Sequence, residues 1–161
     1  MLSQTICEAI NRQINMEIHS AYAYFAMASY CKSVELCGSA SWLEKQAQEE
    51  LGHAKKFMDY LLDRQSKISL GAIAKPQTEF SCLSQVFELA LKQERSVTAS
   101  ICEIMGQAIA EKDYATQGLL QWFINEQTEE EATADSILNK LKALEGNAAG
   151  IFFLDKMLGE R

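Results

Sequence analysis

The stretch Glu50-Leu51-Gly52-His53 lies in the middle of a segment, residues 41–65, whose apolar side chains recur at helical spacing. Leu43, Glu50 and Phe57 follow one another at intervals of seven residues, and His53 lies one helical turn beyond Glu50. Side chains at these spacings share one face of an α-helix. The segment is therefore predicted to be a helix, opened by the capping-box pattern Ser41-Trp42-Leu43-Glu44, with a glutamate and a histidine on its apolar face.

Three further segments show the same periodicity and span about residues 5–32, 81–110 and 114–145. The apolar face of the first is interrupted by Glu17, that of the second by Glu94, and that of the third by Gln127 and Glu130. Burying one ionised carboxylate in an apolar interior costs several kcal/mol, so four of them at one level of a bundle need a compensating cation. These interruptions therefore predict a bound metal.

The connection over residues 66–80 contains Gly71 and Pro76 and separates two of the predicted helices. A helix of about 25 residues is roughly 37 Å long, and about 15 extended residues at roughly 3.3 Å each could return the chain to the same end. We therefore expect helices 41–65 and 81–110 to be parallel. A short apolar helix is expected over residues 148–158, packed either on its own bundle or against another subunit. The fold prediction is one all-α domain, residues 1–161: a four-helix bundle with a long crossover and a short fifth helix.

The composition of the chain limits which kinds of molecule it is expected to bind and where in the cell it is expected to work. The formal net charge of −7 argues against nucleic acid, whose phosphates reward clustered Lys and Arg. The five cysteines form no C-x-x-C pair and are expected to be reduced thiols. The sequence begins without a basic stretch followed by an apolar one, and no apolar run approaches the roughly 18 residues of a membrane span. We therefore expect a cytoplasmic protein with no membrane partner.

The residue types at the predicted metal site indicate which metal it takes. Several carboxylates with one imidazole suit ferrous or manganous ions, whereas structural zinc favours cysteine and histidine. Di-iron carboxylate bundles use a glutamate from each of two helices and a Glu-x-x-His motif from each of the other two. Here Glu17 and Glu94 supply the single glutamates and Glu50 with His53 supplies one motif, while the fourth helix offers Gln127-x-x-Glu130 instead. On these residues the chain resembles the ferritins, in particular the prokaryotic non-haem ferritins, over essentially its whole length.

The resemblance implies a di-iron centre. One iron would be held by Glu17, Glu50 and His53. Its neighbour would be held by Glu50, Glu94 and Glu130, so that Glu50 bridges the two ions. The haem-binding branch has a methionine directly after the glutamate of the second helix and a Glu-x-x-His motif in the fourth, and this sequence has neither, so no haem is expected.

The resemblance also suggests roles for residues around the two irons. Gln127 would lie beside them, and Tyr24 would orient a ligand or supply an electron. The alternative for Tyr24 is a packed aromatic side chain whose hydroxyl is hydrogen-bonded. A third iron position toward an inner cavity would use Glu49, Glu126, Glu129 and again Glu130. The alternative for this acidic run is a solvated helix face.

The function implied by the resemblance is iron storage. A ferroxidase of this kind oxidises Fe(II) with O2 or H2O2 and deposits ferric mineral inside a homo-oligomeric shell of 24 subunits. Two alternatives remain: a di-iron oxidase or peroxidase that stores nothing, and a purely structural bundle. The structural bundle would leave four carboxylates on core faces unexplained.

Overall fold

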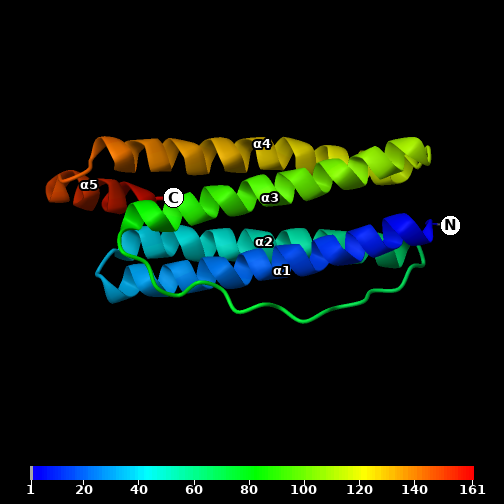
Figure 1. Ribbon diagram of the computed structural model, residues 1–161, viewed down its shortest axis with the longest axis horizontal. Helices are drawn as coiled ribbons and strands as arrows, with labels where there is room; N and C mark the ends of the chain where they lie inside the picture. The colour runs from blue at the N-terminus through cyan, green and yellow to red at the C-terminus, as the bar shows by residue number, and fades with distance from the viewer. Residues whose placement is uncertain (1) are drawn as a thin grey trace.

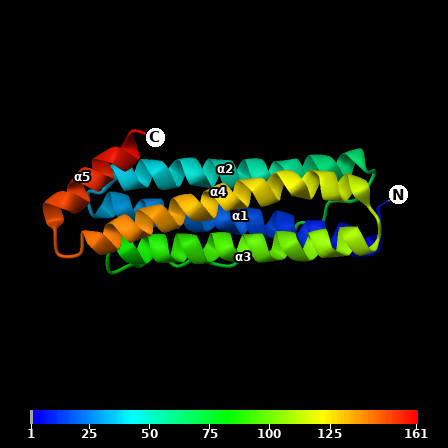
Figure 2. The ribbon, with the colours of Figure 1, turned by 90° about the horizontal axis from the view of Figure 1, so that it is seen from above.

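The computed structural model describes residues 2–161 and contains five helices. They are α1 (Gln4–Ser33), α2 (Cys37–Asp63), α3 (Leu83–Ala110), α4 (Tyr114–Ala143) and α5 (Ala148–Gly159). The first four lie side by side along the long axis, and α5 folds back at one end (Figures 1 and 2). The predicted all-α bundle with a short fifth helix is confirmed.

The connection from α2 to α3 runs along the whole bundle, so α2 and α3 point the same way while α1 with α2, and α3 with α4, are antiparallel (Figure 1). Two asparagines of α1 hold this extended segment in place. The Asn11 amide donates to the Lys67 carbonyl at 3.1 Å and accepts from the Ser69 N–H at 2.6 Å. Asn15 accepts from the Gly71 N–H at 3.1 Å. These bonds satisfy backbone groups that have no helical partner.

The interior consists of two apolar clusters with a polar layer between them. In α2, Ala47 belongs to one cluster and Ala54 to the other, and Glu50 and His53 lie between them. Each of the other three long helices also contributes to both clusters, with a buried polar side chain between the two contributions. These side chains are Glu17 in α1, Glu94 in α3 and Gln127 in α4. The four helices therefore bring their polar residues to one level, with apolar packing on both sides.

Helix α2 begins at Cys37, four residues before the predicted start at Ser41. Its N-terminal amides are capped by a residue distant in sequence: Asp155 of α5 accepts from the Gly38 N–H at 3.1 Å and from the Ser39 N–H at 2.6 Å. A β-carbon at Gly38 would lie 1.8 Å from the Asp155 carbonyl oxygen, so glycine permits this close approach. Sequence periodicity could not reveal a cap supplied by another helix.

Helix α5 packs on its own bundle through one face, and within residues 2–161 nothing covers its other face. Leu154 and Leu158 are buried. Phe152, Phe153 and Met157 are 69%, 65% and 50% exposed. Within residues 2–161, no helix has both the length and the apolar character needed to cross a membrane.

Candidate metal centre

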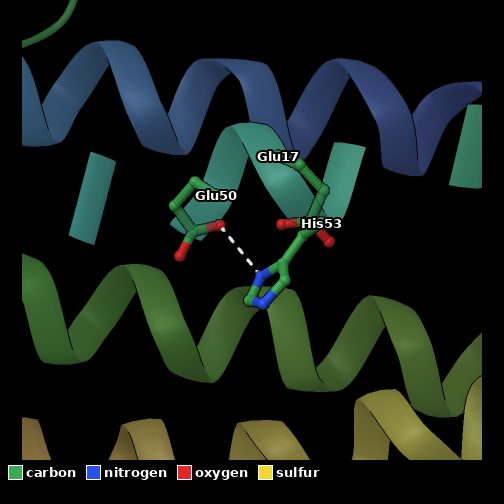
Figure 3. Close-up of side chains that lie close together, drawn as sticks. All are labelled: Glu17, Glu50 and His53. Carbon is green, nitrogen blue, oxygen red and sulfur yellow. Dashed lines mark ion pairs between the residues drawn. The ribbon is translucent and has the colours of Figure 1, made fainter. Parts of the chain in front are cut away.

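The first group of potential metal ligands joins α1 to α2. One ligand atom from each of Glu17, Glu50 and His53 lies within 4.8 Å of the other two. All three side chains are buried, and Figure 3 shows them converging from the two helices. His53 Nδ1 lies 3.7 Å from Glu50 Oε2, beyond hydrogen-bonding distance (Figure 3).

The second group joins α2, α3 and α4. Ligand atoms of Glu50, Glu94 and Glu130 again lie within 4.8 Å of one another. Glu50 belongs to both groups, which is the arrangement expected for a bridging carboxylate. A third combination, His53 with Glu126 and Glu130, meets the same distance limit.

Several ligand atoms in these groups are buried without a hydrogen-bond partner among residues 2–161. They are Glu17 Oε2, both carboxylate oxygens of Glu50, His53 Nδ1 and Glu130 Oε2. Leaving a buried polar atom unpaired costs about 1–3 kcal/mol, and more for a charged group. A cation placed among these atoms would satisfy them together, so the residues present fit an oxygen-rich metal site with one imidazole.

Burial and mutual repulsion raise the pKa values of the carboxyl groups. Desolvation and then the charge of Glu50 raise the pKa of Glu17 well above its ordinary value. Desolvation, followed by the charges of Glu94 and Glu130, does the same to the pKa of Glu50. Desolvation and the charge of Glu94 raise the pKa of Glu130 to about 9. Each of these shifts favours the protonated carboxyl group in the metal-free site, whereas a bound cation would favour the ionised form.

Glu94 is the most strongly hydrogen-bonded carboxylate of the set. The fully buried Tyr24 donates its hydroxyl hydrogen to Glu94 Oε1, and Gln127 Nε2 donates to Glu94 Oε2 at 3.1 Å. Desolvation still raises the pKa of Glu94, although both bonds oppose that shift. Tyr24 and Gln127 thus both contact Glu94, a predicted ligand, and fix the orientation of its carboxylate.

Two glutamines that the sequence prediction did not include donate hydrogen bonds to other predicted ligands. Gln13 donates to Glu17 Oε1 at 2.8 Å, and Gln46 donates to Glu130 Oε1 at 3.3 Å. Each lies one helical turn before a predicted ligand, Gln13 before Glu17 and Gln46 before Glu50, and faces the core. That spacing is the sequence signal by which both could have been found.

The residues predicted for a third iron position surround one small cavity. Its volume is about 110 Å³, and its lining includes Glu49, Glu126, Glu129 and Glu130. Arg161, which follows α5, also lines it. Glu130 therefore lines this cavity and also belongs to the second ligand group.

Comparison with known proteins identifies the class of protein that this fold and this centre define. A family model described as a ferritin-like domain matches residues 7–144. The chain belongs to the ferritin family.

Two named relatives and one solved structure match this chain over all or nearly all of their length. A protein of Bacteroides fragilis named "Bacterial non-heme ferritin" is 40% identical over 161 residues and covers 100% of both chains. One of Staphylococcus aureus with the same name is 37% identical, covering 100% of this chain and 97% of its own. The crystal structure of an open-pore ferritin from the archaeon Archaeoglobus fulgidus matches with a TM-score of 0.99 at 42% identity, covering 100% of this chain and 99% of the other.

Proposed function

We propose that this protein is an iron-storage ferritin whose di-iron centre oxidises Fe(II) with O2 or H2O2 and delivers ferric mineral to the interior of a 24-subunit shell. The observation that carries the proposal is Glu50. Its side chain is buried, takes part in two adjacent ligand groups and has both carboxylate oxygens unpartnered within residues 2–161. A carboxylate in that position is suited to two cations side by side.

Iron is the substrate at this centre. Glu17 and His53 would bind one ferrous ion, Glu94 and Glu130 would bind the other, and Glu50 would hold both. Two ferrous ions together give two electrons, and O2 takes up these electrons and two protons to become H2O2. With H2O2 as oxidant, two electrons and two protons yield two water molecules. Paired ions thus avoid release of a one-electron product.

The protein's own groups prepare the site for this chemistry. Tyr24 and Gln127 hold Glu94 in place, and Gln13 and Gln46 hold Glu17 and Glu130. Carboxylates can shift between terminal and bridging contacts as the charge on iron rises, and their negative charge favours the ferric product. The acidic cavity lined by Glu126 and Glu129 would hold the third iron.

Storage requires assembly, and α5 supplies a surface suited to it. Phe152, Phe153 and Met157 are exposed on the isolated chain, and large apolar side chains clustered on a surface favour contact with another subunit. The formal net charge of −7 per chain would draw cations toward a closed shell. The five cysteines are free thiols, and free thiols are typical of proteins in the reducing cytoplasm, which is the location that we propose.

Replacing Glu50 by alanine tests the centre directly. Ferric absorbance is followed after air-saturated buffer is mixed with two ferrous ions per chain, for the wild type, Glu50→Ala and the control Glu44→Ala. Glu44 lies on the same helix and pairs with Lys32 at the surface. The proposal predicts slow oxidation in Glu50→Ala and normal oxidation in the control. Normal oxidation and metal content in Glu50→Ala would refute it.

A further inference from the structure

Arg161 brings a positive charge to the acidic cavity beside the di-iron centre. Its Nη2 atom lies 2.7 Å from Glu49 Oε2 and 3.0 Å from Glu49 Oε1. Its Nη1 atom donates to Gln46 Oε1 at 2.6 Å, and its guanidinium carbon lies 4.9 Å from the centre of the Trp42 ring. Two hydrogen-bonding partners and an aromatic face therefore hold the guanidinium in one position.

This contact continues to a predicted iron ligand through Gln46. A guanidinium has donors and no acceptor, so the Gln46 amide must turn its oxygen toward Arg161. Its NH2 group then faces the other way and donates to Glu130 Oε1 at 3.3 Å. Glu130 Oε2 remains without a partner among residues 2–161. Arg161 thus fixes the direction from which Glu130 is hydrogen-bonded.

The charges around the cavity show what the guanidinium does there. Four carboxylates line it, those of Glu49, Glu126, Glu129 and Glu130, and Arg161 is the cationic side chain in that lining among residues 2–161. Glu49, to which Arg161 is bound, is the one lining carboxylate supplied by α2. A metal ion coordinated by Glu49 and Glu130 would compete with Arg161 for the same oxygens of Glu49.

We propose that Arg161 is a built-in counter-cation for Glu49 that a third iron must displace, so that it weakens binding at the third position relative to the first two. This inference rests on the proposed function, because it assumes a di-iron centre with a third position beside it. Arg161 acts as a positioning residue: it touches Glu49 and Gln46 and reaches Glu130 only through Gln46.

The size of the effect follows from the exposure of the ion pair. The side chains of Arg161 and Glu49 are 35% and 47% exposed, so the pair is screened by solvent. Pairs of this kind are typically worth up to about 1 kcal/mol, which corresponds to a change in affinity of up to about fivefold. Removing the guanidinium should therefore tighten the third binding step about two- to fivefold at low salt, with a smaller effect at high salt.

The test is a calorimetric titration of metal-free protein with Fe(II) under strictly oxygen-free conditions, which reports binding without turnover. Arg161→Met keeps an unbranched side chain over Trp42 but removes the charge. Arg161→Lys keeps the charge but loses the planar guanidinium, whose two terminal nitrogens donate separately to Glu49 and Gln46. Lys140→Gln is the matched control, since it removes one positive charge from the neighbouring groove that Arg161 also lines.

The inference predicts a third step that is two- to fivefold tighter in Arg161→Met, smaller tightening in Arg161→Lys, and wild-type behaviour in Lys140→Gln, with the first step, at Glu17 and His53, unchanged throughout. It is overturned if the third step is equal or weaker in Arg161→Met, if no variant shows a third step, or if Lys140→Gln tightens it equally. Loss of the two tight steps in the wild type would instead refute the proposed function, so the two failures are distinguishable.

Discussion

Replacing Glu50 by glutamine should make the metal-free protein more stable while removing its oxidase activity. Glu50 is 1% exposed, faces the carboxylates of Glu17, Glu94 and Glu130, and has two unpartnered oxygens within residues 2–161. Glutamine has nearly the same shape, carries no charge and can donate an amide hydrogen to a neighbouring carboxylate. In the absence of metal, the substitution removes repulsion and supplies a missing donor.

The magnitude follows from the cost of burying like charges. An unsatisfied buried polar group costs about 1–3 kcal/mol, and more when it is charged, so relieving the unpartnered Glu50 carboxylate should gain about 2 kcal/mol. For a chain of this length each kcal/mol corresponds to roughly 2–4 °C, so the melting temperature should rise by about 4–8 °C near pH 8.

The assay is thermal unfolding of chelator-stripped protein followed by circular dichroism, with and without added Zn2+. The matched control is Glu44→Gln, whose side chain is exposed and whose melting temperature should move by less than about 2 °C. Added Zn2+ should stabilise the wild type more than Glu50→Gln. A fall in the metal-free melting temperature of Glu50→Gln would refute the reasoning, because it would mean that the Glu50 carboxylate is stabilised by the fold without a cation.

Three further predictions follow from the same geometry. The metal-free wild type should lose stability as pH rises from about 4.5 toward 9, because burial raises the carboxyl pKa values, that of Glu130 to about 9, above their unfolded values; a flat melting profile would contradict this. Glu130→Ala should weaken the second ferrous ion in an anaerobic titration without unfolding the chain, and unchanged stoichiometry would argue against its role as a ligand. Gly38→Ala should displace α5 and cost about 1–3 kcal/mol in unfolding free energy, because its β-carbon meets the Asp155 carbonyl; wild-type stability would exclude the tight contact.

The bundle was predictable because each long helix carries its core pattern within its own sequence. Leu43, Glu50 and Phe57 mark one face without knowledge of any other helix. The crossover was predictable from its length. The start of α2 at Cys37 was not, because the carboxylate that accepts the Gly38 N–H belongs to Asp155, in a different helix.

In the candidate site, too, some residues could be predicted from the sequence and others could not. Glu17 and Glu94 stand out in sequence because a charged residue interrupts an apolar face, and the structure brings both to the level of Glu50. The pairing of Arg161 with Glu49 depends on how α5 folds back over α2, which no local pattern encodes. Contacts within one helix turn could therefore be anticipated, whereas those between distant elements required coordinates.

The most direct test of the central claim is size-exclusion chromatography after aerobic addition of ferrous iron in large excess over two ions per chain, with protein and iron recorded together. The account predicts that iron stays in solution and elutes with a particle near 430 kDa, the approximate mass of 24 chains of 18.0 kDa. A small oligomer carrying about two irons per chain, with the remaining iron precipitated, would contradict storage and leave a di-iron oxidase or peroxidase that stores nothing.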